Sequence, residues 1–296
     1  MKRIICSAVA GKNRALRVGG FQRKVSLILL IALALVLPCS AALAEQIEIV
    51  GAVTSAQAPA AQPTPAISEA DEVDMAMARA SLKSEPMPQG RLEGLIIGID
   101  PGHQAHANSD KEPIAPGSSE KKAKVASGTS GVSTGIPEYE TDLEIALKLR
   151  DALLDEGCTV YMTHDTADVD ISNLERAEMM NEYGCDIVLR LHCDGSTDRS
   201  ANGIGMFVRK TGEKQEESEA AAQVLLEKMS EATGAKARGV FLRDTYTMNN
   251  WSVVPCILVE MGYMSNPDED EKLNDPDYQS LLVEGMVEGL CAYFER

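Results

Sequence analysis

LIIGIDPGH, residues 95–103, and CDIVLRLH, residues 185–192, are two apolar runs that each end on a histidine. Both runs have the composition of buried strands. The chain contains only four histidines, and composition alone does not explain two of them at strand ends. In an open α/β sheet, ligands bind in the crevice beyond the carboxyl ends of the strands, where both imidazoles would lie. We therefore expect a metal site that contains His103 and His192.

The sequence outward from these runs alternates between strand-like and helix-like segments. This alternation is typical of one α/β domain, and we expect a three-layer domain with a central, mostly parallel twisted sheet flanked by helices. We predict the bounds of the strands and helices from hydrophobic periodicity and from turn residues. Strands are predicted at 95–100, 158–164, 185–192, 203–210, 240–243 and 256–263, and helices at 138–157, 172–183, 213–233 and 277–294.

A long polar stretch separates His103 from the helix that begins at Glu138. Residues 104–137 show neither a strand pattern nor a helix pattern. Irregular inserts of this length in a compact domain are usually functional or disordered. Because the stretch follows His103 directly, we interpret it as a flap or rim over the site.

The first 44 residues differ from the rest of the chain. They contain seven Lys or Arg, no Asp or Glu, and the apolar run VSLILLIALALVL at 25–37. A basic region, a short apolar core and the sequence Ala42-Leu43-Ala44 are typical of a signal peptide, so we predict that 1–44 is cleaved and that the protein is secreted. The alternative is an uncleaved membrane anchor, because the apolar stretch approaches the length of a membrane span.

Composition divides the remainder into two parts. Residues 45–90 are rich in Ala, Pro, Gln and Ser and are predicted to form a linker, with one short helix at about 70–83. Residues 91–296 are predicted to form the folded domain.

The charge balance limits the partners. The chain has 28 basic and 45 acidic residues, and loss of the seven basic residues in the signal segment would change its net charge from −17 to −24. So acidic a protein is unsuited to nucleic acid or to an anionic membrane surface. We expect membrane contact only through an uncleaved signal segment, and an uncharged glycan or peptide as the substrate.

The cysteines do not indicate a metal site. Five of them follow the signal segment: Cys158, Cys185, Cys193, Cys256 and Cys291. Their number is odd and they form no CxxC pair, so we expect small core residues rather than disulfides or a thiolate zinc site. Cys193 follows His192, but neighbours on a strand point to opposite faces, so the two are not expected to share a metal.

Two glutamates are predicted at the same sheet edge as the histidines. Glu138 opens the first long helix, and Glu260 lies near the carboxyl end of the strand CILVEMGY. Two imidazoles and one carboxylate are the protein ligands of a common catalytic zinc, which leaves a second carboxylate available as a base. Taken alone, His103 also suits a turn, and Glu138 also suits a helix start. Glu260 favours a functional interpretation, because burying an unpaired charge is costly.

Three further residues are candidates for contact with the substrate or with the metal ligands. Arg190 shares a strand face with His192, and it could hold one of the two glutamates, bind a substrate carboxylate, or only neutralise acidic neighbours. Asn250 and Trp251 precede the strand of Glu260. The single tryptophan could be a platform for a sugar or peptide, and core packing is an equal alternative.

Five segments resemble, in the same order, the zinc-dependent N-acetylmuramoyl-L-alanine amidases that cut bacterial peptidoglycan. They are LIIGIDPGHQ, EYETDLEIALKLRDAL, CTVYMTHDT, ISNLERAEMMNEYGCDIVLRLHCDGS and PCILVEMGYMSNPDEDEKL. The resemblance covers about residues 93–296. It implies that 91–296 is a zinc amidase catalytic domain and that the protein acts in the cell wall.

The resemblance also assigns roles to the residues at the sheet edge. It implies that Zn²⁺ is bound by His103, Glu138 and His192, and that Glu260 is the catalytic glutamate. Glu140 and Glu144 are alternatives for the helix ligand, but the match through LEIALKLRDAL favours Glu138.

The other two histidines are not assigned to zinc. His164 stands in the segment THDT, where the family commonly has an arginine, and we interpret it as a structural or rim residue. His106 lies on a polar loop and is expected to be solvated.

The implied reaction is hydrolysis of the amide between N-acetylmuramic acid and L-alanine, with peptidoglycan as the partner. Two alternatives stay open from the sequence. One is a secreted protein that binds peptidoglycan without cutting it. The other is a zinc peptidase or deacetylase that acts on a related wall substrate.

Overall fold

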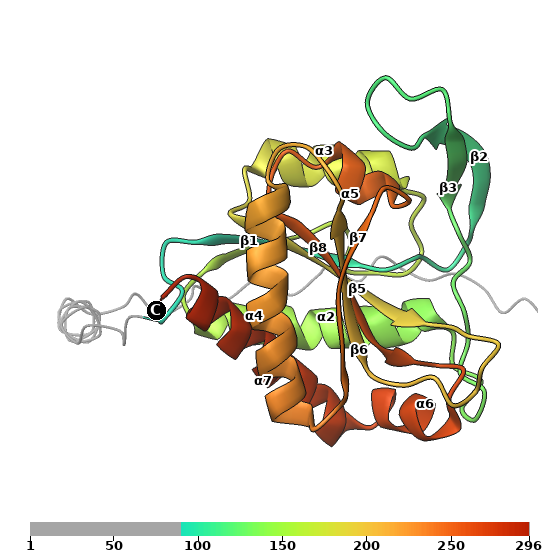
Figure 1. The fold of residues 1–296 in the computed structure, drawn as a ribbon, viewed down its shortest axis with the longest axis vertical. Helices are drawn as coiled ribbons and strands as arrows, with labels where there is room; N and C mark the ends of the chain where they lie inside the picture. The colour runs from blue at the N-terminus through green and yellow to red at the C-terminus, as the bar shows by residue number, and fades with distance from the viewer. Residues whose placement is uncertain (1–89, 296) are drawn as a thin grey trace, which may run out of the picture. The chain divides into compact units, whose positions relative to one another are not determined.

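A computed structural model of the chain describes residues 90–295 (Figure 1). The predicted signal peptide at 1–44, the short helix at 70–83 and all of the predicted linker except Gly90 lie outside the described residues.

Eight strands and six helices make up the described part of the chain. The strands are β1 (Ile96–Pro101), β2 (Asn108–Pro113), β3 (Lys121–Val125), β4 (Thr159–Met162), β5 (Ile187–Asp194), β6 (Ile204–Arg209), β7 (Ala237–Arg243) and β8 (Cys256–Tyr263). The helices are α2 (Glu138–Asp155), α3 (Asn173–Tyr183), α4 (Gln215–Thr233), α5 (Thr247–Trp251), α6 (Pro267–Leu273) and α7 (Pro276–Tyr293).

Six strands form one mostly parallel sheet in the order β4-β1-β5-β8-β6-β7. Neighbouring strands are parallel except β6 and β8, which are antiparallel. The strands β1, β5 and β8 therefore run in the same direction, and their carboxyl ends meet at one edge of the sheet. The expected fold class, a mostly parallel sheet flanked by helices, is confirmed.

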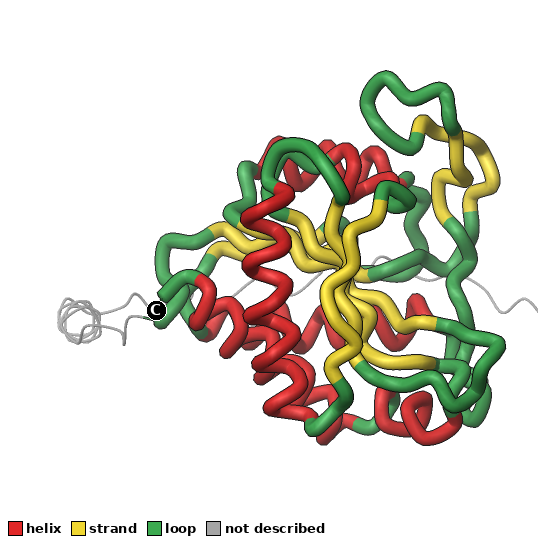
Figure 2. The backbone as a smooth tube through the Cα atoms, viewed as in Figure 1, coloured by secondary structure: helices red, strands yellow, loops and turns green. Residues whose placement is uncertain are grey.

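Helices cover both faces of this sheet (Figure 2). One face packs with α2, α4 and α7 in the larger apolar cluster, and the other packs with α3 and α5 in a smaller one. Alternate residues of strand β5 face the two sides of the sheet. Leu189, Leu191 and Cys193 belong to the larger cluster, whereas Arg190 and His192 face a pocket on the other side. Alternation along the strand thus separates Cys193 from His192, as predicted.

The prediction that 104–137 lacks regular structure was wrong. Strands β2 and β3 form an antiparallel hairpin that stands apart from the six-stranded sheet (Figure 1). Their sequences, NSDKEP and KKAKV, are too polar to show an alternating pattern. The hairpin nevertheless buries the side chains of Ile114 and Val125.

Other differences are small. Strand β7 begins at Ala237, three residues before the predicted start, and the short helices α5 and α6 were not predicted. The capping box of Ser172 and Glu175 starts α3 where the sequence indicated. The five cysteines predicted to be core residues are all buried and free. Within residues 90–295, no helix combines the length and the apolar character needed to cross a bilayer.

Candidate metal centre

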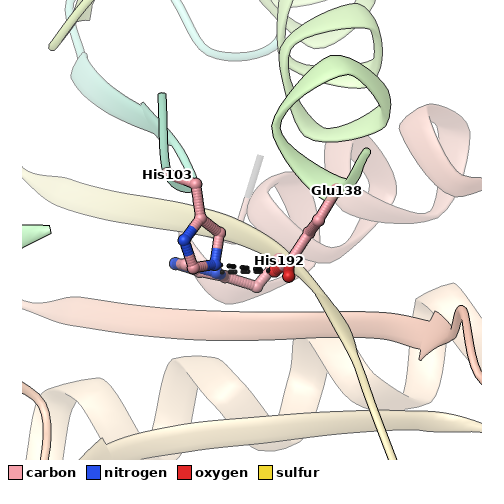
Figure 3. Close-up of side chains that lie close together, drawn as sticks. All are labelled: His103, Glu138 and His192. Atoms are coloured by element: carbon pink, nitrogen blue, oxygen red, sulfur yellow. Dashed lines mark hydrogen bonds and ion pairs between the residues drawn. The ribbon is translucent and has the colours of Figure 1, made fainter. Parts of the chain in front are cut away.

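Three predicted ligands meet at the carboxyl edge of the sheet (Figure 3). His103 follows β1, Glu138 is the first residue of α2, and His192 lies near the end of β5. One oxygen of Glu138, Oε1, lies 3.0 Å from His103 Nε2 and 3.1 Å from His192 Nδ1. Within the described residues, these three form the group of candidate metal ligands whose donor atoms all lie within 4.8 Å of one another.

The donor set fits a zinc ion. Zinc bonds of 2.0–2.1 Å place neighbouring ligands of a tetrahedral site about 3.3 Å apart. The distances from Glu138 Oε1 to the two imidazole nitrogens are close to this value. Two imidazoles and one carboxylate also leave a fourth tetrahedral position for water or substrate.

A backbone carbonyl group fixes the orientation of the His103 imidazole through the nitrogen that does not face Glu138. Its Nδ1 lies 2.9 Å from the carbonyl oxygen of Ala126, which accepts a hydrogen bond from it. That bond keeps a proton on Nδ1, so Nε2, which faces Glu138, is the nitrogen that can bind a metal once its own proton is lost. The backbone of His103 has a φ of 60°, which is uncommon for a residue other than glycine.

The carboxylate of Glu138 is fixed by backbone donors. The N–H of Thr129 donates to Oε2 at 2.7 Å, and the N–H of Cys193 donates to Oε1 at 3.2 Å. The close approach requires glycine at Gly128, which has a φ of +76°. An added Cβ at this residue would lie 2.9 Å from Glu138 Oε2. Loop and strand therefore position the carboxylate before any metal binds.

The protonation states suit a metal site. Burial raises the pKa of Glu138, but hydrogen bonds from the two histidines more than offset this and hold it below its usual range. Burial lowers the pKa of His192 to about 4, despite its contact with Glu138. Burial also acts to lower the pKa of His103, but the hydrogen bond to Glu138 outweighs it and the pKa is raised. The protein thus presents an ionised carboxylate and a neutral His192.

Glu260 lies beside this group on β8. It pairs in register with His192 across β5 and β8, and its side chain is nearly buried. Among the described residues, no group donates a hydrogen bond to its Oε2. Burial, together with the charges of Asp194 and Glu138, raises the pKa of Glu260 well above its usual value. A carboxyl group in this environment can take up and release a proton.

A pocket of about 250 Å³ opens over these residues. Its lining includes two of the metal-ligand candidates, Glu260, and residues of β3 and of the segment before α5. They are His103, Lys122, Ala123, Val125, Ala126, Asn173, Arg190, His192, Thr245, Tyr246, Thr247, Leu258 and Glu260. The predicted flap or rim is therefore a strand of the hairpin that forms one wall of the pocket.

Arg190 lines the pocket but forms an ion pair with neither glutamate. Its Nε donates to Asp100 at 2.9 Å, and its terminal nitrogens donate to Asn249 and Asn173. Of the three roles that the sequence allowed for Arg190, these contacts match the neutralisation of an acidic neighbour.

Asn250 and Trp251 do not line the pocket. Asn250 Nδ2 donates to the carbonyl oxygens of Ile114 and Asp244. Trp251 Nε1 donates to the carbonyl oxygen of Pro113, and its ring packs against the smaller apolar cluster. Both side chains therefore attach the hairpin to α5.

The residues excluded from the metal site lie elsewhere. His106, Glu140 and Glu144 are exposed, and Glu144 pairs with Lys148. His164 is buried with its Nδ1 3.0 Å from Thr163 Oγ1, and burial lowers its pKa to about 4.

A buried network behind His103 was not predicted from the sequence. Asp100 accepts hydrogen bonds from Arg176 and Arg190, each at 2.9 Å. Arg176 also donates to the carbonyl oxygens of Pro101 and His103. The only signal in the sequence was an aspartate within the apolar run LIIGID, whose burial requires a partner.

Comparisons with known proteins identify the family of the chain. The sequence model of the N-acetylmuramoyl-L-alanine amidase family matches residues 97–292. The germination-specific N-acetylmuramoyl-L-alanine amidase of Bacillus subtilis is 25% identical over 219 residues, covering 69% of this chain and 81% of that protein. An N-acetylmuramoyl-L-alanine amidase of Mycobacterium tuberculosis is 26% identical over 235 residues, covering 74% of this chain and 94% of that protein.

A solved structure shares the fold. The crystal structure of the N-acetylmuramyl-L-alanine amidase Ami1 from Mycobacterium smegmatis superposes with a TM-score of 0.63 at 23% identity, covering 69% of this chain and 98% of that one. The family match spans most of the described domain and includes Glu260 and the three clustered residues that could hold a metal. The chain therefore belongs to the N-acetylmuramoyl-L-alanine amidase family of hydrolases.

Proposed function

We propose that this amidase uses Zn²⁺, held by His103, Glu138 and His192, to cut the amide between N-acetylmuramic acid and the L-alanine of the peptidoglycan stem. The observation that carries the proposal is the meeting of three metal-ligand atoms beside Glu260 in one pocket. The neutral imidazole expected at His192 and the ionised carboxylate of Glu138 are the forms that bind a divalent cation.

Glu260 acts as the general base in this proposal. A zinc ion bound at the site supplies Lewis acidity, which polarises the scissile carbonyl and makes a water molecule more acidic. Glu260 takes a proton from the attacking water and later delivers it to the nitrogen of the leaving alanine. Because the carboxylate returns to its starting state, the residue is ready for the next cycle.

The surroundings of Glu260 favour proton transfer. Burial raises its pKa, whereas the guanidinium groups of Arg238 and Arg190 act in the opposite direction. A positive metal ion beside the carboxylate would also lower its pKa. A general base works best when its pKa lies near the operating pH, and these opposing effects support that role for Glu260.

Replacement of Glu260 by Gln tests the role of the base. The Glu260→Gln enzyme is expected to fold and to bind zinc but to lose hydrolysis by about 10²- to 10⁴-fold, the usual contribution of general acid–base catalysis. Purified sacculi are incubated with each enzyme, with and without a chelator, and the products are analysed. Glu140→Gln, an exposed change in the first turn of α2, is the matched control.

The products separate this reaction from its alternatives. New L-alanine amino termini with intact glycan strands support the amidase assignment. Released acetate would instead indicate a deacetylase, and cleaved cross-links would indicate a peptidase. Full activity of Glu260→Gln would remove Glu260 as the base while leaving the family assignment in place.

Action on peptidoglycan implies an extracytoplasmic location. We propose in addition that 1–44 is a signal peptide that directs secretion, that 45–90 is a linker and that 91–296 is the catalytic domain. Mass spectrometry of the exported protein tests the first of these boundaries. A mature amino terminus at Glu45 supports cleavage after Ala44, and an intact Met1 in the membrane fraction contradicts it.

A further inference from the structure

The β2–β3 hairpin forms one wall of the pocket over the metal-ligand group. Lys122, Ala123 and Val125 of β3 line this wall, and Ala126 continues it to His103. The segment from Thr245 to Thr247 lines the pocket as well. Two segments that contain none of the three candidate metal ligands therefore form walls of the pocket.

The hairpin is attached at several points to the rest of the domain. The carboxylate of Glu112 accepts from the N–H of Leu174 at the start of α3, and Asn173 Nδ2 donates to the carbonyl oxygen of Lys124. On the other side, Trp251 and Asn250 donate to the carbonyl oxygens of Pro113 and Ile114. These contacts hold the backbone of β3 beside the pocket.

Lys122 reaches from this wall to the other side of the pocket. Its Nζ donates a 2.7 Å hydrogen bond to the carbonyl oxygen of Thr245. A lysine ammonium has three donors. The bond to Thr245 therefore orients the group and leaves donors for a ligand at the exposed side of Lys122.

The pocket has two side chains that carry a permanent positive charge, Lys122 and Arg190. Arg190 is buried, and Asp100, Asn249 and Asn173 accept its hydrogen bonds. Lys122 is exposed and is bonded to a neutral carbonyl oxygen. Among the described lining residues, Lys122 is therefore the cation best placed to attract an anion from the substrate.

We infer that Lys122 binds a carboxylate of the peptide stem and makes the enzyme selective for acidic stem peptides. The inference rests on the proposed function, since it assumes that a muramoyl peptide occupies the pocket. The lactyl carboxyl of the muramoyl group is consumed in the amide, so a carboxylate that reaches Lys122 comes from the peptide. A local cation is needed because the chain has a net charge of −17, which repels an anionic ligand.

Two substrates and two variants test the inference. The substrates are N-acetylmuramoyl-L-alanyl-D-glutamic acid and its diamide, which differ only in the charge of the residue after alanine. The zinc-loaded enzyme is compared with Lys122→Ala and with the control Lys121→Ala, which removes an exposed lysine of the same strand that does not line the pocket. The ratio of kcat/KM for the acid to that for the diamide is measured at low and high salt.

The wild-type enzyme and Lys121→Ala are expected to prefer the acid. Lys122→Ala is expected to lower the ratio of kcat/KM for the acid to that for the diamide by about 5- to 10-fold, as for a partly exposed charge-assisted hydrogen bond, while loss of the bond to Thr245 affects both substrates alike. High salt should reduce the preference of the wild-type enzyme, because ions screen exposed charges. The same ratio in wild-type and Lys122→Ala enzymes would overturn the inference.

A binding measurement separates this inference from the proposed reaction. Equilibrium binding of both dipeptides is measured with zinc-loaded Glu260→Gln protein and with the same protein carrying Lys122→Ala. A preference for the acid that depends on Lys122 supports the subsite. If the wild-type enzyme nevertheless cut neither dipeptide, that result would refute the proposed reaction alone. Equal binding of the acid and the diamide by Glu260→Gln protein would overturn the subsite.

Discussion

Arg176 donates a hydrogen bond of 2.6 Å from its Nη2 to the backbone carbonyl oxygen of His103. The same guanidinium binds the carbonyl oxygen of Pro101 and the carboxylate of Asp100. His103 has a positive φ, which costs free energy in a residue other than glycine. Because Arg176 is buried on α3 and joins both sides of this turn, it stabilises the backbone that aims the His103 imidazole at Glu138.

Replacement of Arg176 by Lys is therefore expected to weaken zinc binding. A lysine cannot reach the separate acceptors that the planar guanidinium bridges. Loss of such a supporting contact typically costs about 10- to 100-fold in metal affinity. Zinc affinity is measured by competition with a chelating dye, and Arg150→Lys, which changes an exposed ion pair with Asp151, is the control. A folded Arg176→Lys protein with unchanged zinc affinity would contradict this positioning role.

Asp100 is expected to be essential for stability. Burial raises its pKa, but Arg176 and Arg190 more than offset this and hold the pKa below its usual value of 3.8. Asp100→Asn removes the negative charge that neutralises the two buried guanidinium groups of Arg176 and Arg190. Removing one partner of a buried ion pair lowers the free energy of unfolding by about 3–5 kcal/mol. Urea unfolding in the presence of a chelator measures this cost. Lys228→Ala, which breaks an exposed pair with Glu231, should cause no measurable change.

The sign of the pH dependence follows from the lowered pKa. The contribution of Asp100 is fully present above the unfolded pKa of 3.8 and is lost as the pH falls toward the lower folded pKa. The difference in stability between wild type and Asp100→Asn should therefore shrink below about pH 4. A difference that stays constant down to pH 2 would show that the charge of Asp100 is not the cause.

The main sheet could be predicted because its buried strands are continuous apolar runs. The predicted range 256–263 coincides with β8, and each other predicted strand of the sheet overlaps an observed one. Because the carboxyl ends of β1 and β5 lie at one edge, the sequence also predicted that His103 and His192 are close together. The reason is geometric, since parallel neighbours bring their carboxyl ends to the same side.

The hairpin and the network around Arg176 could not be predicted in this way. The strands β2 and β3 are polar, and their contacts are made with residues far along the chain, such as Trp251. Arg176 lies 76 residues from Asp100, and its neighbours in sequence give no sign that it is buried. Periodicity describes the face that an element buries, but it does not identify a polar partner from another element.

Zinc affinity is expected to rise with pH through the pKa of His103. Burial acts to lower the pKa of His103, but the hydrogen bond to Glu138 outweighs burial and raises this pKa above its usual 6.5. For His192, burial dominates and lowers the pKa to about 4. In metal-free protein at pH 6, His192 is therefore neutral and His103 carries a proton that zinc has to displace. Calorimetry in buffers of different ionisation enthalpy counts the protons released.

The proton count is best measured in the Glu260→Gln protein, because the raised pKa of Glu260 would add a second proton. About one proton should be released near pH 6 and fewer at pH 8.5, as expected when a single ligand titrates. The same affinity from pH 5 to pH 8 would show that His103 is already deprotonated before zinc binds.

Gly102 is expected to be required for the position of His192. A Cβ added at Gly102 would lie 2.6 Å from His192 Nδ1, the atom that faces Glu138, and 2.5 Å from Asp142 Oδ2. The backbone cannot retreat easily, because the N–H of Gly102 donates to the carbonyl oxygen of Leu191 at 2.8 Å. The methyl group of Gly102→Ala must therefore displace the imidazole or the carboxyl group. Overpacking of this kind costs about 1–3 kcal/mol in stability.

Because the displaced atom is a metal-ligand candidate, zinc affinity should fall more than stability does. The control is Gly262→Ala on β8, where an added Cβ would meet its nearest atoms, from Leu273 and Glu269, at 3.4–3.5 Å. This is ordinary van der Waals contact, so Gly262→Ala should keep its zinc affinity. We expect Gly102→Ala to lose about 10-fold or more in affinity, measured with the same chelating dye. Equal affinities for the two variants would mean that His192 can bind zinc from another position, and the geometry in Figure 3 would then not be the binding geometry.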